Sequence, residues 1–574
     1  MKKLLVLLLA LTLILSLAAC GGSKDTPSSA PPSPSGSSPA PSGSSSPSPT
    51  PSALPSPDAS GGVTTETIKS TTGDVTRYIT EAPSKAVKAD PTTLYVGQMV
   101  VIENGNPGSG GDSCVYDLLF DQLITINFET GKYEGKVIKE WEIAEDCLSM
   151  TFTIHDNITF HDGTNAKAED VLYSLGRLNQ PDLARQSDRN VFNNIDYEKC
   201  ETTGDYSGKL VFKSPTISIV AGLTKSWLFS KNHIETLGED NAWWDNCIGT
   251  GMYKVGSIVQ GDRYNFVRND DYWGSEKGNF EKIVVRYYAE ASTMYIDFET
   301  GVLDIIVNPL SADVSRVING AIDNAICDIY PTMQTFSVSF NEEMNSVLSD
   351  VNVRKAVCLA INPAIVTKIA YDFLGVPTNA FFPSGVNDSY TGDYEQDIEA
   401  AKKALADAGY KPGELTLVFG TNTQNVNMAM AEALQAQIAE VGINVDICAV
   451  DPNAHIVNFR NTGTDIYDIS ISMMSFGTLD SSPFLGYISK ACGSMSFVAV
   501  SDEHVDELAI QAKTALAENV KHDSMVELQK FVYDNYWLRP IVDVRTALVY
   551  KDYITGIRAI QPRSPNINAV KLVG

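Results

Sequence analysis

The sequence predicts an α/β fold that is divided into more than one domain. The chain has 574 residues, which is too long for a single hydrophobic core. Strand and helix patterns alternate in its second half, where Leu415–Phe419 is predicted as a strand, Ala429–Val441 as a helix and Gly442–Ile447 as the next strand. This alternation is typical of a lobe in which helices pack against a sheet.

The N-terminus has the pattern of an export signal. Two lysines precede the apolar run Leu4–Leu17, which is shorter than the roughly 20 residues of a membrane-spanning helix. The sequence LAACG at 17–21 resembles a lipobox, at which the signal is removed and the new N-terminal cysteine carries lipid. We therefore expect a lipoprotein signal peptide at 1–20, with lipid on Cys20 as a membrane anchor. The alternative is a signal cut for secretion, with this cysteine incidental.

The next segment is predicted to be a tether. Residues 21–62 are almost wholly Ser, Pro, Gly, Ala and Thr, and such a composition cannot bury enough apolar surface to fold. Residues 64–91 are mixed and poorly patterned, so they are expected to be a lead-in with little structure of its own. The range 21–91 is thus predicted as a Ser/Pro-rich disordered tether and lead-in.

The most informative stretch is Leu148–Leu178. Apolar and polar residues alternate through Ile154, which is the period of a half-buried strand, and Ile158–Phe160 is expected to pair with it as a hairpin. Asp162-Gly163 marks a turn. Apolar residues from Val171 to Leu178 then recur at helical spacing. These patterns predict a hairpin, a sharp turn and an amphipathic helix.

The order of residues in this stretch resembles a family signature. The pattern FTI-x3-I-x-FHDGT-x3-AEDV-x-YSL, beginning at Phe152, is similar to that of the solute-binding proteins of ABC importers for peptides, nickel and oligosaccharides. This is the family of the oligopeptide- and dipeptide-binding proteins. Other segments resemble it in the same order: GTGMY at 249–253, RNDDYW at 268–273, and DVNVRKA at 350–356, where Asn352 replaces the usual Arg. The resemblance extends from about residue 92 to the C-terminus.

The resemblance implies the two-lobed fold of periplasmic binding proteins, of class II and with an extra subdomain. Two hinge strands, near 332–341 and 540–545, would join the two α/β lobes. The predicted boundaries are 92–330 for lobe 1, with an inserted subdomain at about 123–247, then 331–544 for lobe 2 and 545–574 for the return to lobe 1.

The resemblance also implies a function. The chain would be an extracytoplasmic substrate-binding lipoprotein on the outer face of the cytoplasmic membrane, and a monomer. It would capture a peptide between the lobes and deliver it to the permease subunits of an ABC transporter, whose ATPases hydrolyse ATP. Ligand contacts made only in the closed state would shift an open–closed equilibrium about the hinges. No enzyme activity and no cofactor are implied. An oligosaccharide or a nickel chelate is the alternative ligand, although no His cluster favours nickel.

The loop FGTLDSSP at 476–483 decides between ligands. Peptide binders of the family have Trp, two residues, Asp, and Pro four residues after that Asp, which receives the ligand's terminal ammonium. Counting back from Pro483 places Phe476 at the Trp position and Leu479 at the Asp position, so Asp480 comes one residue late. One residue of slip turns a side chain to the other face of a strand. Either the loop is locally shortened and Asp480 still binds an ammonium, or the protein does not anchor a free amino terminus.

Other cleft residues are placed by position and resemblance. Asn104 and Asp112 belong to the glycine-rich loop Glu103–Ser113, which follows the first predicted strand, and Gln334 lies in a predicted hinge strand. The loop lacks the spacing of a dinucleotide or P-loop phosphate cradle. The predicted ligand-binding residues are therefore Asn104, Asp112, Gln334, Phe476 and Asp480, with Phe476 also suited to stacking on a sugar.

Composition excludes several other functions. The formal net charge of −27 opposes binding to nucleic acid, which needs a basic surface. None of the nine cysteines is spaced as C-x-x-C, so a zinc ribbon is not expected, and the eight beyond Cys20 are predicted to be buried free thiols. The sequence has no G-x-S-x-G or H-E-x-x-H motif, and His155 and His161 are expected to be structural. A cell-surface hydrolase is only a distant alternative, and no metal site is predicted.

Overall fold

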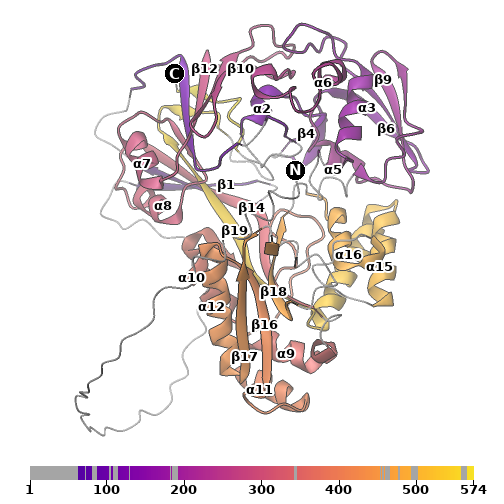
Figure 1. Cartoon of the computed structure of the whole chain (residues 1–574), viewed down its shortest axis with the longest axis vertical. Helices are drawn as coiled ribbons and strands as arrows, with labels where there is room; N and C mark the ends of the chain where they lie inside the picture. Colours follow the sequence, from indigo (N-terminus) through magenta and orange to yellow (C-terminus); the bar gives the residue numbers. More distant parts are fainter. Residues whose placement is uncertain are drawn as a thin grey trace, which may run out of the picture. The chain divides into compact units, whose positions relative to one another are not determined.

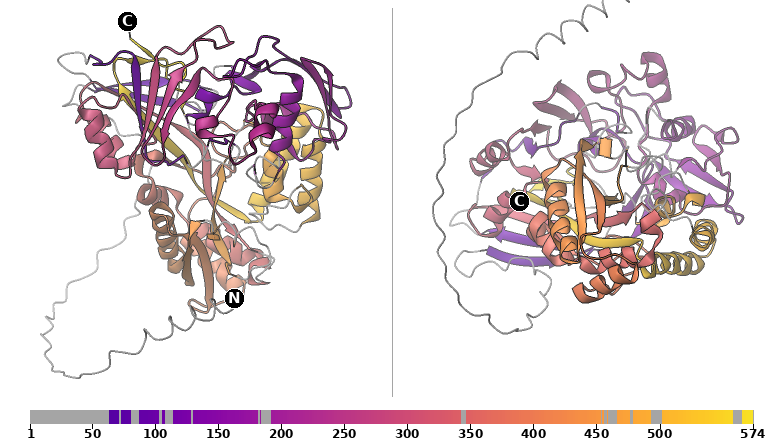
Figure 2. Two further views of the ribbon diagram at one scale, coloured as in Figure 1. Left: turned by 45° about the horizontal axis from the view of Figure 1, so that its top comes forward. Right: turned by 60° about the horizontal axis from the view of Figure 1, so that its bottom comes forward.

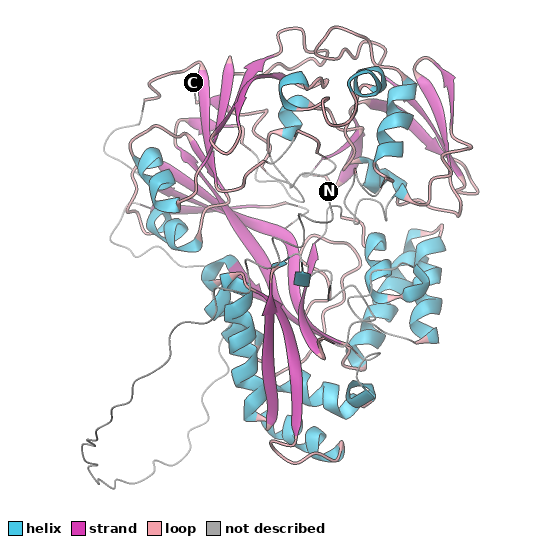
Figure 3. Cartoon of the chain, viewed as in Figure 1, coloured by secondary structure: helices cyan, strands magenta, loops and turns pink. Residues whose placement is uncertain are grey.

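The computed structural model describes most of the chain after residue 62. Helices and strands are interspersed throughout it (Figure 3), and the predicted α/β class is confirmed. The described residues are 63–70, 73–80, 87–102, 105–107, 114–127, 130–180, 183, 192–341, 346–452, 454–455, 458, 466–475, 479–492, 502–557 and 565–573.

A sheet of 13 strands forms the centre of the described structure. In spatial order its main path runs through β10 (Tyr253–Val259), β11 (Arg263–Arg268), β12 (Lys282–Tyr287), β3 (Thr93–Gln98), β13 (Ile305–Val307), β19 (Leu538–Lys551), β14 (Ala325–Phe340), β18 (Ile469–Ser475), β16 (Leu415–Asn422) and β17 (Ile443–Val450). Its parallel pairs are β12 with β3, β3 with β13, and β16 with both β17 and β18, and helix α12 (Asn425–Glu440) provides the crossover from β16 to β17.

The long strands β14 and β19 pair antiparallel over most of their lengths (Figure 1). Each contributes to two different groups of buried side chains. In β14, Cys327 and Ile329 belong to one hydrophobic core, whereas Val338 and Phe340 belong to another. β19 passes between the same two cores in the opposite direction. The predicted hinge strands lie within β14 and β19, and the two-lobed fold with two such strands is confirmed.

A bulge interrupts the pairing of β14 and β19 between the two cores. The register shifts between Pro331 and Gln334. Within the bulge Met333 is buried with a φ of 54°, a conformation that is costly for a residue other than glycine. Thr332 Oγ1 donates to the carbonyl of Val544 at 2.9 Å. The bulge thus sets the direction of β14 at Gln334, where pairing with β19 resumes opposite Val544.

A smaller four-stranded sheet has a hydrophobic core of its own, within the predicted subdomain. Strand β7 alternates buried and exposed residues, as its sequence predicts. Helix α3 (Ala168–Arg177) begins where the backbone N–H of Lys167 donates to the Asp170 carboxylate at 2.8 Å. The sheet order is β6 (Ile138–Ile143), β7 (Ser149–Ile154), β9 (Ser207–Val211) and β8 (Glu201–Gly204), and the hairpin β4 (Ile124–Asn127) and β5 (Lys132–Gly135) precedes it.

The predicted hairpin partner of β7 is wrong. Both edges of β7 are occupied by β6 and β9. Thr159, in the expected partner segment, instead forms an isolated bridge with Asn165 across the turn. Gly163 in that turn has a φ of 84°, which glycine adopts without strain. The segment after β7 is therefore a short local loop that leads into α3.

Helices pack on the strands of both lobes. Four of those after β14 begin with an Asp or Asn whose side chain accepts a backbone N–H, namely Asp350, Asn362, Asp397 and Asp502. Helix α12 lies beside β16 and β17 (Figure 2). The helices are α2 (Tyr116–Leu119), α5 (Ile219–Leu223), α6 (Lys231–Leu237), α7 (Ala291–Glu299), α8 (Ser311–Ile318), α9 (Val351–Ala360), α10 (Pro363–Ala370), α11 (Ile398–Asp407), α12 (Asn425–Glu440), α14 (Leu485–Ile488), α15 (Glu503–Thr514) and α16 (Glu518–Asp534).

An N-terminal hairpin extends the main sheet, in a segment that the sequence predicted to have little structure. Strands β1 (Val63–Ile68) and β2 (Val75–Thr80) pair with each other, and β2 also pairs with β14. Arg77 of β2 donates two hydrogen bonds to the buried Asp328 of β14, at 2.8 and 2.9 Å. Regular structure is therefore already present at Val63, about 30 residues before the predicted start at residue 92.

The Gly249-Thr250-Gly251 motif joins three parts of lobe 1. The backbone N–H of Gly251 donates to Leu119 O at 2.9 Å. The Nδ1 of His161 accepts the Gly249 N–H at 3.2 Å, and its Nε2 lies 3.1 Å from Gly251 O. The motif thus connects α2 to the turn before α3 and to β10, and this histidine is structural, as predicted.

His161 makes the stability of the protein depend on pH. Burial lowers its pKa from 6.5 to about 4, so the unfolded chain takes up a proton between these two values and the folded chain does not. The free energy of unfolding should therefore fall as the pH decreases from 6.5 to 4, by about 3 kcal/mol from this residue. Urea titrations across this range should show a shallower pH dependence for His161→Gln. The exposed His504→Gln is the control, and an unchanged slope in His161→Gln would contradict the assignment.

The eight cysteines beyond Cys20 are free thiols, as predicted. Five of them are buried and three are half-buried, so burial is confirmed for most of them. Cys20 itself lies outside the described residues. Among the described helices, none has the length and apolar character that a bilayer crossing requires.

Candidate functional site

Two of the predicted ligand-binding residues lie at the same end of strand β18. Gln334 is half-buried on β14, opposite Ser475, and its Nε2 donates to Ser475 Oγ at 3.4 Å. Asp480 follows the same strand five residues later. The other predicted residues, Asn104, Asp112 and Phe476, lie outside the described residues.

Asp480 is buried and already paired with a lysine. Its Oδ1 accepts the ammonium of Lys521 at 2.5 Å and the backbone N–H of Ser482 at 2.8 Å. The two charged side chains are 9% and 12% exposed. A carboxylate with so little contact with water needs a counter-charge and hydrogen-bond donors, and the protein supplies both from its own residues.

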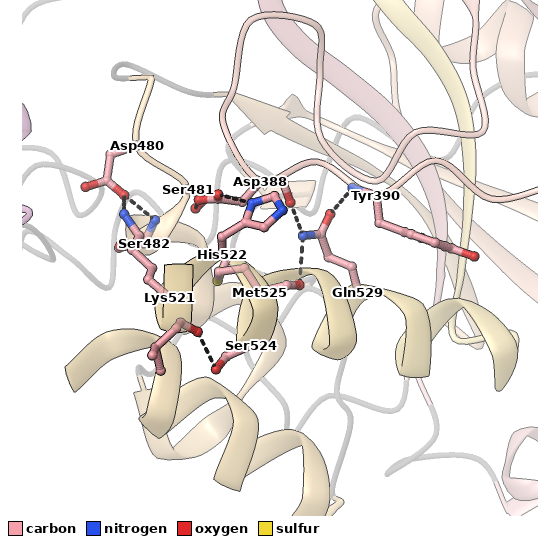
Figure 4. A network of polar contacts seen from close by, with 11 residues as sticks. Asp388, Tyr390, Asp480, Ser481, Ser482, Lys521, His522, Ser524, Met525 and Gln529 are labelled. Carbon is pink, nitrogen blue, oxygen red and sulfur yellow. Dashed lines mark hydrogen bonds and ion pairs between the residues drawn. The ribbon is translucent and has the colours of Figure 1, made fainter. Parts of the chain in front are cut away.

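A second group of polar contacts lies next to this ion pair (Figure 4). The carboxylate of Asp388 accepts the hydroxyl of Ser481 at 2.7 Å and lies 2.7 Å from Nδ1 of His522. Ser481 and Asp480 are neighbours in one loop, as are His522 and Lys521 in helix α16. The loop after β18 is therefore attached to α16 in two ways. Asp480 pairs directly with Lys521, and the carboxylate of Asp388 contacts both Ser481 and His522.

Gln529 attaches a third segment to the same helix. Its Nε2 donates to Asp388 O at 2.6 Å, and its Oε1 accepts the N–H of Tyr390 at 2.9 Å. The side chain is fully buried, so both bonds are protected from water. Three segments that are distant in the sequence, around residues 388, 480 and 525, thus form one hydrogen-bonded unit.

The hairpin β4–β5 reaches this unit from the other lobe. Ile126 of β4 packs against the core that contains Leu479, Phe484 and Met525. On β5, the pKa of Tyr133 is raised by burial and by the negative charge of nearby Asp480. Residues of the β4–β5 hairpin therefore lie next to the core that contains the loop at 479–484.

Sequence reasoning did not find Lys521, although α16 carries a signal. Lys521 stands four, seven and eleven residues before the buried Met525, Leu528 and Val532. These spacings put it on the apolar face of the helix. A lysine at such a position requires a buried acidic partner, but the sequence does not show which carboxylate, 41 residues away, supplies it.

A cavity of about 690 Å³ lies elsewhere, in lobe 1, between α2, the segment around residue 277 and the C-terminal residues. Its lining includes Asp121 and Lys136. Asp121 is engaged by the protein itself, because it accepts hydrogen bonds from Tyr272 and Trp273, both at 2.8 Å, and pairs with Lys136 at 3.3 Å. These groups stabilise the fold. In the described part of the chain, no group of His, Cys, Asp and Glu side chains could hold a metal ion.

Known proteins resemble the chain in sequence and in fold. Residues 132–496 match the model of the bacterial extracellular solute-binding proteins, family 5 middle region. The dipeptide-binding protein of Escherichia coli is 25% identical over 382 residues, which cover 60% of this chain and 69% of that protein. The glutathione-binding protein GsiB of Pectobacterium atrosepticum is 24% identical over 56% of this chain and 62% of its own length.

A solved structure has the same fold. The periplasmic binding protein DppA of Helicobacter pylori, in complex with the peptide STSA, superimposes with a TM-score of 0.70 at 20% identity, over 84% of this chain and 98% of that one. The family model covers more than half of the 574 residues, and the hinge-strand architecture agrees with it. The chain belongs to the bacterial extracellular solute-binding proteins of family 5.

Proposed function

We propose that the chain is the substrate-binding lipoprotein of an ABC importer, and that it captures a peptide between its two lobes. The observation that carries this proposal is that β14 and β19 both run from one hydrophobic core to the other, in a chain that belongs to this family. Peptide ligands are favoured because relatives and structural neighbours include dipeptide- and peptide-binding proteins. The protein would bind and release its ligand without making or breaking bonds, and its partners would be permease subunits and their ATPases.

The lobes proposed to close on the ligand are 92–330 with 545–574, and 331–544. Gln334 lies beside the bulge between the cores, where a change of backbone angle would move one lobe against the other. Asn104, Asp112 and Phe476 are proposed as further ligand contacts on the strength of the family resemblance.

The proposed anchor is lipid on Cys20, and 21–62 would serve as the tether between membrane and folded protein. This arrangement would hold the protein outside the cytoplasmic membrane, within reach of a permease. Mass spectrometry of the mature protein should find a diacylated cysteine at its N-terminus, and a mature chain that begins at another residue would refute the anchor.

A ligand screen tests the peptide proposal. Short peptides should raise the melting temperature of the purified soluble domain, because a ligand at 100 times its Kd adds about 2.7 kcal/mol to the free energy of unfolding. Oligosaccharides and nickel chelates at the same concentrations should leave it unchanged. Stabilisation by oligosaccharides alone would reject peptides and establish the alternative ligand.

A further inference from the structure

We propose that the ammonium of Lys521 takes the place beside Asp480 that a ligand's terminal ammonium would otherwise occupy. The ligand is then recognised without a free α-amino group at the loop that contains Asp480. This inference rests on the proposed function. It makes Lys521 a residue that determines specificity, and it names the ligand class as peptides whose amino terminus is blocked or is bound elsewhere.

Lys521 and Asp480 are in direct contact. The 2.5 Å separation of Lys521 Nζ and Asp480 Oδ1 is a direct charge-assisted hydrogen bond. The same oxygen also accepts the N–H of Ser482. A ligand ammonium that sought this oxygen would have to displace the lysine.

The packing of helix α16 holds the lysine in place. Lys521 lies on the buried face of α16, and that helix is fixed by the contacts of Gln529 and by the buried Met525 and Leu528. If its ammonium moved out, Asp480 would remain as a buried carboxylate without its counter-charge, which is strongly unfavourable. Displacement by a ligand would therefore exchange one ammonium for another with little gain in affinity.

The charge of the site also disfavours a ligand ammonium. The Asp480–Lys521 pair is neutral as a unit, so the attraction that a lone carboxylate would exert on an incoming ammonium is largely cancelled. A second ammonium close to the pair would also be repelled by Lys521 at short range in a poorly solvated site. On this proposal, the loop with the one-residue slip does not anchor an amino terminus.

The experiment compares matched peptides on matched variants. Tetra-alanine and N-acetyl-tetra-alanine are titrated calorimetrically into the wild type, Lys521→Met and Asp480→Asn/Lys521→Met. The wild type should bind the two peptides with Kd values that differ by less than about threefold. Lys521→Met, which removes the positive charge beside Asp480, should prefer the free amino peptide by at least tenfold, and the double variant should lose that preference. Lys530→Met is the control, because Lys530 lies on the same helix in an exposed ion pair, 54% exposed, with Asp534.

A second readout does not depend on peptides. Methylammonium chloride should raise the melting temperature of Lys521→Met relative to sodium chloride, and should not do so for the wild type or the double variant. The double variant, in which neither side chain is charged, should fold even if Lys521→Met is unstable.

The outcomes separate the two proposals. A wild type that prefers free amino peptides tenfold, or a Lys521→Met variant without either a preference or a response to methylammonium, would overturn the role of Lys521. If no peptide binds any variant but methylammonium stabilises Lys521→Met, the ammonium position is supported and the peptide function is rejected.

Discussion

Replacing Gly249 with alanine is expected to lower the free energy of unfolding by about 3 kcal/mol or more. A Cβ at this position would lie 1.9 Å from Leu119 O. The opposing atom belongs to the backbone, so no side-chain rotation can relieve the overlap. Gly251 has the same constraint, since its Cβ would lie 2.3 Å from Leu118 O. The motif therefore contains glycine for close backbone approach, rather than for a turn with an unusual φ.

The measurement is urea denaturation followed by tryptophan fluorescence, together with the yield of soluble protein. The matched control is Gly176→Ala in helix α3, where a Cβ would have no neighbour within 4 Å. There alanine should leave stability unchanged or raise it by up to about 1 kcal/mol, because it favours a helix more than glycine does. If the Gly249→Ala protein were as stable as the wild type, the backbone at residue 249 could move away from Leu119 without cost, which would contradict the prediction.

The family and its fold could be predicted from local order in the sequence. Motifs such as GTGMY and the 148–178 stretch are continuous in sequence, and each reflects contacts with nearby turns or backbone. The hinge strands could also be located, because the resemblance to the family implied strands near 332–341 and 540–545, and these ranges fall in β14 and β19. The strand pairing of β7 was predicted wrongly. Ile158–Phe160 lies next to β7 in the sequence, yet β6 and β9 occupy both edges of β7.

The candidate site was predicted less well, for a physical reason. The one-residue slip at Asp480 left two interpretations open, and the residue that bears on them lies 41 positions later on a helix. Ion-pair partners across such distances depend on how the chain folds as a whole. Residues 388 and 529 were missed for the same reason, since their side chains acquire a role only where three segments meet.

The N-terminal hairpin was missed because its strands lack a clear apolar pattern. Strand β1 has five exposed residues out of six, and the period-2 alternation that indicates a half-buried strand is absent from it. Strand β2 is stabilised by pairing with β14, which is distant in the sequence, and by Arg77. The N-terminal hairpin is thus attached to a strand that crosses between the lobes, and this attachment can be tested directly.

Replacing Arg77 with methionine should lower the free energy of unfolding by about 3 to 5 kcal/mol. The Asp328 side chain is only 2% exposed, and Arg77 supplies two of its hydrogen bonds, the third coming from Tyr550 at 3.2 Å. Without Arg77 the buried carboxylate loses its counter-charge. Methionine keeps much of the apolar volume of the arginine side chain, so the loss would report the charge.

Two variants show whether the effect comes from the buried charge. Arg77→Met/Asp328→Asn should recover much of the loss, because an amide needs no counter-charge at this position. Arg263→Met removes an exposed ion pair with Asp262, whose side chains are 50% and 54% exposed, and should cost less than about 1 kcal/mol. Urea denaturation of all three measures the differences. A loss below about 1 kcal/mol in Arg77→Met, equal to that of the exposed pair, would mean that β2 contributes to the sheet by backbone pairing alone.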